Sequence, residues 1–268
     1  MHIPFEKYKR VFAFGCSFTS YIYPTWADIL ASEMPNAEYY NFGLSGAGNM
    51  FIAARVIEAN RRFKFTETDL IMIMYSTSFR EDRYIDNAWQ GPGHIYNQSY
   101  YPMKTFVYPY CQPRGMLLKD LAMIEASSSY IRSLPCGNVL LRSTAVLDEA
   151  KDALTFVEEE TIDIVALYKE LLDSFPPNMY DTEFPNGWKH GVKYINDGKL
   201  VEDAHPTPQN YYNYLSKIGI NLSELSKKYI DETNEKLNRC IGKDMAVDFP
   251  REFPEGCNRR DQARIIMF

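Results

Sequence analysis

Apolar and polar positions follow two different periods in the first 75 residues of the chain. Three short apolar segments, Lys9–Phe14, Glu38–Phe42 and Asp69–Tyr75, have the length and composition of buried strands. Between them, apolar residues recur at helical spacing over Trp26–Glu33 and over Asn49–Asn60, with Asn49 as the cap of the second helix. This order predicts βαβ units, and hence an α/β fold in which helices cover both faces of a mainly parallel sheet.

The pattern changes after the third strand. Tyr84–Tyr110 holds eight aromatic residues and three prolines without a clear period. Because it is too apolar for a free linker, we expect an ordered insertion, within residues 79–135, that lies on the domain. Its aromatic rings either form a wall that stacks on sugar rings or cover the sheet edge or a dimer contact, and the sequence leaves both readings open.

The rest of the chain continues the alternation of strands and helices. No internal repeat and no linker divides it, so we expect one domain over residues 1–268. A C-terminal tail is expected at 239–268, and its part from Asp244 to Phe268 has no assigned role. The expected elements are a helix over Met116–Ser133, a strand over Asn138–Val146, and helices over Ile164–Phe175, Pro208–Ile218 and Leu222–Leu237.

Composition and charge exclude several classes of protein. The chain has 268 residues, of which 46% are hydrophobic and 15% aromatic, so disordered and fibrous classes are excluded. A net charge of −6 without a basic stripe argues against a nucleic-acid partner. Five scattered cysteines without a CxxC pair argue against disulfides and structural zinc. With no export signal or membrane-spanning run visible, we expect a cytoplasmic protein, of open oligomeric state.

Three short segments fall where open α/β sheets bind ligands, at the carboxyl ends of strands or close to such an end. The first is Gly15-Cys16-Ser17, and we expect Ser17 to enter the first helix, whose positive end would stabilise an alkoxide. The second is Gly43–Asn49, in which glycines would let backbone donors approach a substrate. The third is Glu202–Pro208, which contains a histidine beside two carboxylates.

A serine nucleophile needs a base that a third group orients. Of the four histidines, His205 is the one with carboxylates within three residues, Glu202 and Asp203, so it is the predicted base. Either carboxylate could orient the imidazole. We favour Asp203, because its shorter side chain beside a tight loop leaves the ring less freedom.

Taken together, Gly15-Cys16-Ser17, Leu44–Asn49 and Asp203-Ala204-His205-Pro206 resemble the SGNH/GDSL hydrolase superfamily. This resemblance implies a flavodoxin-like α/β/α sandwich, and an esterase, lipase, carbohydrate O-acyl hydrolase or O-acyltransferase activity. It also implies that Ser17 is the nucleophile, that Gly46 is the glycine of the oxyanion hole, and that His205 is the base.

The chain departs from the family pattern at three places. Cysteine replaces the aspartate that usually precedes the serine, at a position outside the catalytic groups. The family's asparagine after the third strand is missing, and Ser78 stands roughly in its place. The family spacing Asp-x-x-His puts Glu202 in register, one residue before Asp203. We therefore expect the oxyanion to bind the backbone N–H groups of Ser17 and Gly46, together with Ser78 or Asn49.

Other roles are open for some of these residues. Ser17 could simply cap a helix, and Cys16 could act as a thiol nucleophile. The glycines at 43–48 could form a phosphate loop, although their spacing differs from that of dinucleotide-binding motifs. Arg80 could hold an anionic group or be a surface charge. We expect neither a metal nor a cofactor, and the candidate substrate-binding residues are Tyr75, Arg80, Tyr84 and Trp89.

The sequence thus predicts a serine-dependent hydrolase of acyl esters, with a carbohydrate O-acetyl group as the preferred substrate. The substrate would be a small molecule or a glycan. Two alternatives remain at this point. One is an O-acyltransferase that passes the acyl group to a sugar hydroxyl, and the other is a catalytically silent module that binds a glycan or a protein.

Overall fold

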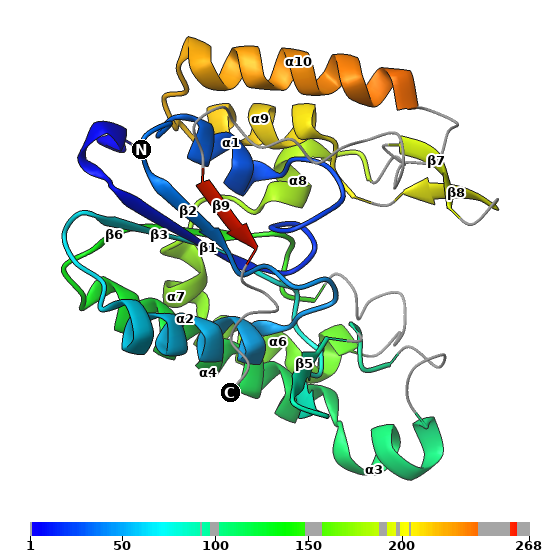
Figure 1. Ribbon diagram of the computed structural model, residues 1–268. Helices are drawn as coiled ribbons and strands as arrows, with labels where there is room; N and C mark the ends of the chain where they lie inside the picture. Colours follow the sequence, from blue (N-terminus) through cyan, green and yellow to red (C-terminus); the bar gives the residue numbers. More distant parts are fainter. Residues whose placement is uncertain are drawn as a thin grey trace.

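The computed structural model describes residues 2–91, 93–96, 102–147, 157–187, 192–196, 199–203, 205–240 and 258–261. Within them, a central sheet has the strand order β6-β3-β1-β2-β9, and every neighbouring pair is parallel (Figure 1). The order β2-β1-β3-β6 is that of flavodoxin-like sheets. The strands are β1 (Arg10–Gly15), β2 (Glu38–Asn41), β3 (Asp69–Tyr75), β6 (Gly137–Arg142) and β9 (Asn258–Asp261).

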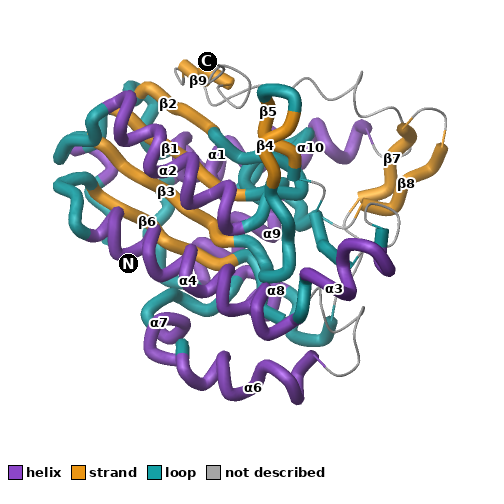
Figure 2. Tube along the Cα trace, turned by 90° about the horizontal axis from the view of Figure 1, so that it is seen from below, coloured by secondary structure: helices purple, strands orange, loops and turns teal. Residues whose placement is uncertain are grey.

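Helices cover both faces of the sheet, which confirms the predicted three-layer α/β/α sandwich. Figure 2, viewed from the side of α2 and α4, shows these two helices crossing in front of the strands. One face carries α1 (Trp26–Ser32), α8 (Met179–Glu183), α9 (Pro208–Lys217) and α10 (Glu224–Cys240), and the other carries α2 (Asn49–Phe63) and α4 (Pro113–Arg132), with α6 (Val157–Leu167) and α7 (Lys169–Asp173) beyond α4.

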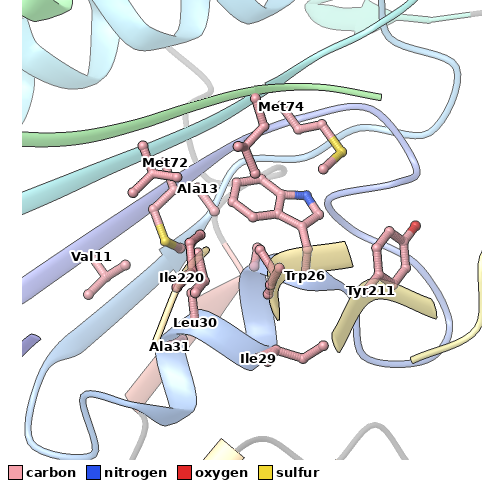
Figure 3. Packing of buried hydrophobic residues seen from close by; sticks show 14 of the residues in the cluster. Val11, Ala13, Trp26, Ile29, Leu30, Ala31, Met72, Met74, Tyr211 and Ile220 are labelled. Atoms are coloured by element: carbon pink, nitrogen blue, oxygen red, sulfur yellow. The ribbon is translucent and has the colours of Figure 1, made fainter. Parts of the chain in front are cut away.

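The alternation of side chains along each strand divides the core in two. Val11 and Ala13 of β1 pack toward α1 and α9, where Trp26 is completely buried (Figure 3). Phe12 and Phe14, at the intervening positions, pack on the opposite face toward α2 and α4. Strand β3 alternates in the same way, so a continuous apolar segment is buried on both sides, as parallel strands require.

The insertion after β3 has a small core of its own. Phe79, Ile95 and Val107 pack with Leu117 and Leu121 of α4, so this segment is anchored on the domain. Residues 92 and 97–101 of the predicted aromatic wall lie outside the described residues. The described elements of the segment are β4 (Arg83–Ile85), β5 (Ala88–Gln90), the π-helix η2 (Met103–Val107) and α3 (Tyr108–Tyr110).

Two element boundaries differ from the sequence-based expectation, and one strand was not expected. Strand β6 ends at Arg142, where its partner β3 ends at Tyr75, and does not continue to residue 146. The helix expected over Ile164–Phe175 is divided into α6 and α7 at Tyr168. The C-terminal tail contributes β9 to the sheet edge beside β2, although most of residues 241–268 lie outside the described part.

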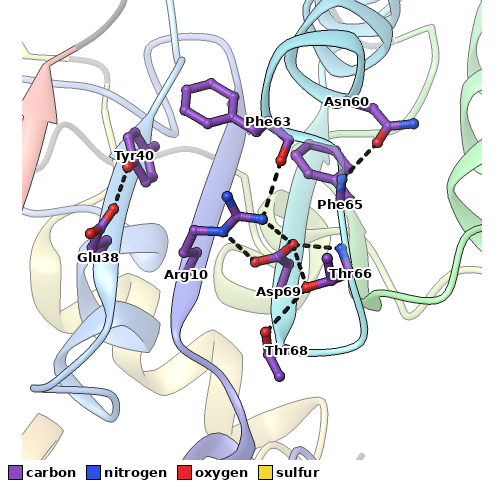
Figure 4. A network of polar contacts seen from close by, with 9 residues as sticks. All are labelled: Arg10, Glu38, Tyr40, Asn60, Phe63, Phe65, Thr66, Thr68 and Asp69. Atoms are coloured by element: carbon purple, nitrogen blue, oxygen red, sulfur yellow. Dashed lines mark hydrogen bonds and ion pairs between the residues drawn. The ribbon is translucent and has the colours of Figure 1, made fainter.

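A partly buried ion pair joins β1 and β3 at the end of the sheet where both strands begin (Figure 4). Arg10 donates from Nε and Nη2 to the two carboxylate oxygens of Asp69, both at 2.7 Å. Asp69 is completely buried and also accepts bonds from the backbone N–H and hydroxyl of Thr66. The opposite end of the same strands leads into the loops described below.

Two short elements complete the described structure. They are the 3₁₀ turn η1 (Phe5–Lys7) and the antiparallel hairpin of β7 (Val192–Asn196) and β8 (Lys199–Asp203). No helix in the described part of the chain is long and apolar enough to cross a lipid bilayer.

Candidate active site

Ser17 lies in a tight turn that follows β1. The backbone N–H groups of Thr19 and Ser20 both donate to the carbonyl oxygen of Cys16. Helix α1 begins only at Trp26, because a capping box between Thr25 and Asp28 starts it there. The expectation that Ser17 enters the first helix, or caps it, is therefore wrong.

Thr19 holds this turn in place. Its hydroxyl accepts a bond from the indole N–H of Trp26 at 3.2 Å, and its carbonyl oxygen accepts bonds from Thr25 and Asn41. Gly15 makes room for it, since a Cβ on Gly15 would lie 2.0 Å from the Thr19 hydroxyl oxygen. The turn that carries Ser17 is thus fixed to both α1 and β2.

The glycine-rich loop after β2 is hydrogen-bonded to the end of β1. The Leu44 N–H donates to the carbonyl oxygen of Gly15 at 3.0 Å, and a Cβ on Gly43 would lie 2.9 Å from the backbone nitrogen of Ser20. Within the described residues, neither the N–H of Ser17 nor that of Gly46 donates to a protein acceptor. Two backbone donors therefore remain available in these adjacent loops.

His205 follows β8 and bonds to Ser17, although 188 residues separate the two in sequence. Its Nε2 lies 2.8 Å from Ser17 Oγ, and its Nδ1 lies 2.7 Å from Asp203 Oδ1. Asp203 Oδ1 also accepts the backbone N–H of His205 at 2.9 Å, as in an Asx-turn. Glu202 belongs to β8, but its side chain lies outside the described residues. Asp203 is thus the carboxylate bonded to His205.

The Asp203 carboxylate is almost fully buried, at 3% exposure, yet both of its oxygens accept hydrogen bonds from protein donors. Burial alone would raise its pKa, but the hydrogen bonds and charge from His205 and the hydroxyl of Tyr23 outweigh burial and lower that pKa. Tyr23 donates to Asp203 Oδ2 at 3.0 Å. Burial and the neighbouring carboxylate in turn raise the pKa of Tyr23 well above its usual value.

Two more aromatic rings flank His205. Tyr21 stacks on the imidazole, with ring centroids 3.8 Å apart and planes at 22°, and Phe18 meets it edge-on at 5.5 Å. The sequence reasoning missed Phe18, Tyr21 and Tyr23, although all three follow the candidate nucleophile within six residues. The cluster of aromatic residues directly after Ser17 was the feature of the sequence that could have indicated them.

Asn49 does not fit its predicted roles. Gly48 precedes α2 as its cap, and Asn49 is its first residue. Its side chain is completely buried, donates to the carbonyl oxygen of Ser76 at 3.2 Å and accepts the Ser76 N–H at 3.0 Å. Because its amide is occupied in joining α2 to the end of β3, we remove Asn49 from the candidate oxyanion hole. The hydroxyl of Ser78, buried without a partner among the described residues, stays a candidate.

Two buried carboxylates connect the loop after β3 to the N-terminus of α2. Asp82 accepts the N–H groups of Gly48 and Phe51, at 2.7 and 2.8 Å. Asp120 accepts the Phe79 N–H at 2.8 Å, and burial raises its pKa to about 7. Burial also raises the pKa of Asp82. These bonds hold the start of α2, directly after the Gly46 loop.

The four candidate substrate-binding residues lie in different environments. Tyr75 is completely buried and its hydroxyl bonds to Ser127, so it cannot contact a substrate and that expectation is wrong. Arg80 donates to the carbonyl oxygen of Ala47, in the loop that carries Gly46. Tyr84 and Trp89 pair edge-on across the β4–β5 hairpin, and Tyr84 is 51% exposed.

Neither a thiol nucleophile at Cys16 nor a metal site gains support from the described residues. Cys16 is buried in the core on the α2 side of the sheet, away from solvent. Among the residues that the structure describes, no three histidine, cysteine, aspartate or glutamate side chains gather as a metal site.

No protein-family model and no curated protein matches this chain. Among solved structures, it is similar to a GDSL-like lipase from Bacteroides thetaiotaomicron VPI-5482, with 17% identity, a TM-score of 0.38, and coverage of 84% of this chain and 88% of that one. It is also similar to a member of the lipolytic protein G-D-S-L family from Veillonella parvula DSM 2008, with 15% identity, a TM-score of 0.41, and coverage of 78% and 94%.

Proposed function

We propose that this protein is a serine hydrolase of acyl esters of the SGNH/GDSL type. The observation that carries the proposal is the continuous hydrogen-bonded line from Ser17 Oγ through His205 to Asp203, with bonds of 2.8 and 2.7 Å. Serine, imidazole and carboxylate in this arrangement make up the machinery of nucleophilic acyl transfer, whatever their order in the chain.

In the proposed reaction, His205 Nε2 takes the proton of Ser17 as Oγ attacks the acyl carbonyl carbon. The carbonyl oxygen becomes the oxyanion of a tetrahedral intermediate, which the free N–H groups of Ser17 and Gly46 would stabilise, with the hydroxyl of Ser78 as a third donor. The imidazolium then protonates the leaving alcohol. Water, deprotonated by His205, attacks the acyl-enzyme and releases the acid and free Ser17.

We further propose that the acyl group is small, as in an O-acetyl ester of a sugar. Ser17 is only 6% exposed, which supports a short acyl chain. The β4–β5 hairpin touches the Gly46 loop through Gly91 and carries Tyr84 and Trp89. Aromatic faces of this kind stack on sugar rings, so their position beside that loop supports a carbohydrate alcohol.

Hydrolysis of p-nitrophenyl acetate at pH 8 tests the esterase proposal. We expect activity in the wild type, a loss of at least about 10³-fold in Ser17→Ala, and no loss in Ser129→Ala, which removes an exposed serine on α4. Equal rates for Ser17→Ala and wild type would refute the proposal.

A panel of esters tests the substrate. We expect p-nitrophenyl acetate to be hydrolysed faster than the octanoate, and O-acetylated monosaccharides to be deacetylated in a Ser17-dependent manner. Preference for the octanoate would contradict the proposal of a short acyl chain, and transfer of acetyl to an added sugar in excess of hydrolysis would favour the O-acyltransferase alternative.

A further inference from the structure

Asp203 and His205, two residues apart in the chain, are joined by two hydrogen bonds. One oxygen of the Asp203 carboxylate accepts both the backbone N–H and Nδ1 of His205, at 2.9 and 2.7 Å. The second oxygen therefore points away from the imidazole and needs another donor, since a buried carboxylate oxygen without a partner is costly.

Tyr23 supplies that donor from the segment after the Ser17 turn. Its hydroxyl donates to Asp203 Oδ2 at 3.0 Å and lies 3.3 Å from the carbonyl oxygen of His205. Tyr23 is completely buried, so water does not compete for the contact. The same segment places Tyr21 against the face of the His205 ring, and the two tyrosines pack edge-on at 4.9 Å.

We propose that Tyr23 is a positioning residue for catalysis, whose hydroxyl aligns Asp203 and, through it, His205, while Tyr21 fixes the plane of the imidazole ring. This inference rests on the proposed serine hydrolase function. It extends the site from three side chains to five.

The contact also affects how strongly Asp203 stabilises a protonated His205. A hydroxyl that donates to Asp203 draws charge away from the oxygen that faces the imidazole, so removing it makes Asp203 a stronger acceptor and favours the imidazolium. We therefore expect the pKa of His205 to rise in Tyr23→Phe. The titratable groups that face the pair are Tyr21, Tyr23 and Tyr211, and Cys16 and Asp28 act on Tyr211.

Tyr211→Phe provides a matched control. Tyr211 of α9 is also completely buried near Asp203, but its hydroxyl has no hydrogen-bond partner among the described residues. Both variants remove one phenolic hydroxyl from the same buried region, but only Tyr23→Phe removes a bond to the carboxylate.

The first measurement is the pH profile of p-nitrophenyl acetate hydrolysis for the wild type, Tyr23→Phe and Tyr211→Phe, with thermal denaturation of each. We expect Tyr23→Phe to lower kcat by roughly 10- to 100-fold with KM unchanged, and to move the acid limb of the profile to higher pH. We expect Tyr211→Phe to match the wild type in both. A fall in Tm with an unmoved acid limb would overturn the proposal, since it would assign Tyr23 a structural role alone.

The second measurement is independent of activity. The ring nitrogens of His205, assigned by their absence in His205→Gln, are titrated by NMR in wild type and Tyr23→Phe. An upward shift of the His205 pKa is expected, and an unchanged titration contradicts the contact. This readout separates the two proposals, because Ser17→Ala can fail to abolish hydrolysis while the His205 titration still responds to Tyr23.

A double-mutant cycle tests whether Tyr23 acts through Asp203. If Tyr23 acts through Asp203, its effect on kcat disappears in an Asp203→Asn background. Additive losses in the double variant would show that Tyr23 acts elsewhere.

Discussion

The Cα of Gly46 and the carbonyl group of Gly91 are so close that a Cβ on Gly46 would lie 1.8 Å from the Gly91 oxygen. Gly46 also has a φ of +75°, in the left-handed region that favours glycine. The contact joins the loop with a free backbone donor to the end of the β4–β5 hairpin. The hairpin is thereby part of the site's framework, although it belongs to the insertion.

Gly46→Ala is therefore expected to damage both stability and catalysis. The left-handed conformation alone costs an alanine about 1 kcal/mol or more, and the overlap with Gly91 must displace the loop. Losing one oxyanion donor costs about 10²–10³-fold in kcat.

Kinetics and thermal denaturation of Gly46→Ala check this expectation, with Gly115→Ala on α4 as control. A Cβ on Gly115 meets no atom within 4 Å, so that variant should be as active and slightly more stable. Wild-type kcat in Gly46→Ala would exclude its N–H from the oxyanion hole.

The choice between the two carboxylates before His205 is also testable. Asp203→Asn keeps the size of the side chain but favours the wrong imidazole tautomer, so we expect kcat to fall by about 10⁴-fold. Glu202→Gln is the matched control and should stay within a few-fold of the wild type. The reverse order of effects in a kcat measurement would assign the orienting role to Glu202.

Asp120 should make stability depend on pH. Its pKa in the folded protein is about 7, above the ordinary 3.8, so the buried carboxyl favours the protonated form. Its contribution is complete below about pH 4 and is lost as pH rises through about 7. The difference corresponds to roughly 4 kcal/mol as an upper limit. Tm should thus fall between pH 5 and pH 8.

Asp120→Asn removes this titration, so its Tm should change less over the same range. Asp163→Asn serves as control, because Asp163 is exposed beside Arg114, which lowers its pKa further from this window. A pH dependence of Tm that is the same in wild type and Asp120→Asn would show that other groups cause it.

The ion pair between Arg10 and Asp69 should matter for stability and not for catalysis. Asp69→Ala leaves the Arg10 guanidinium without its bidentate partner and removes the acceptor of Thr66, at the end of the sheet opposite Ser17. Because Arg10 is 27% exposed, water can replace part of the lost contact, so we expect a cost of about 1–3 kcal/mol, or roughly 5 °C in Tm for a chain of this size. Below the transition, kcat should equal that of the wild type, and a large loss of kcat at full folding would connect this pair to the site.

Much of the fold followed from the sequence because it depends on local patterns. The apolar segments of β1 and β3 are buried on both faces, and such segments are visible without knowing their neighbours. Strand β9 was not predicted, since its short polar segment, Asn258–Asp261, becomes a strand only by pairing with β2. The division of the helix at Tyr168 and the early end of β6 were not predicted either, because the spacing of apolar residues does not indicate where a helix breaks or where strand pairing stops.

Some residues of the candidate site were predictable from the sequence, and others only from the tertiary structure. Residue chemistry singled out Ser17 after the first predicted strand, the glycine-rich loop after the second, and His205 beside its two carboxylates, and the resemblance to the SGNH/GDSL superfamily selected Gly46 within that loop. Only the tertiary structure brought Ser17 and His205 within 2.8 Å and selected Asp203 as the bonded carboxylate. It also removed Asn49, whose amide bonds to the end of β3, and added Tyr23, because hydrogen bonds between segments far apart in sequence are decided by packing and not by local spacing.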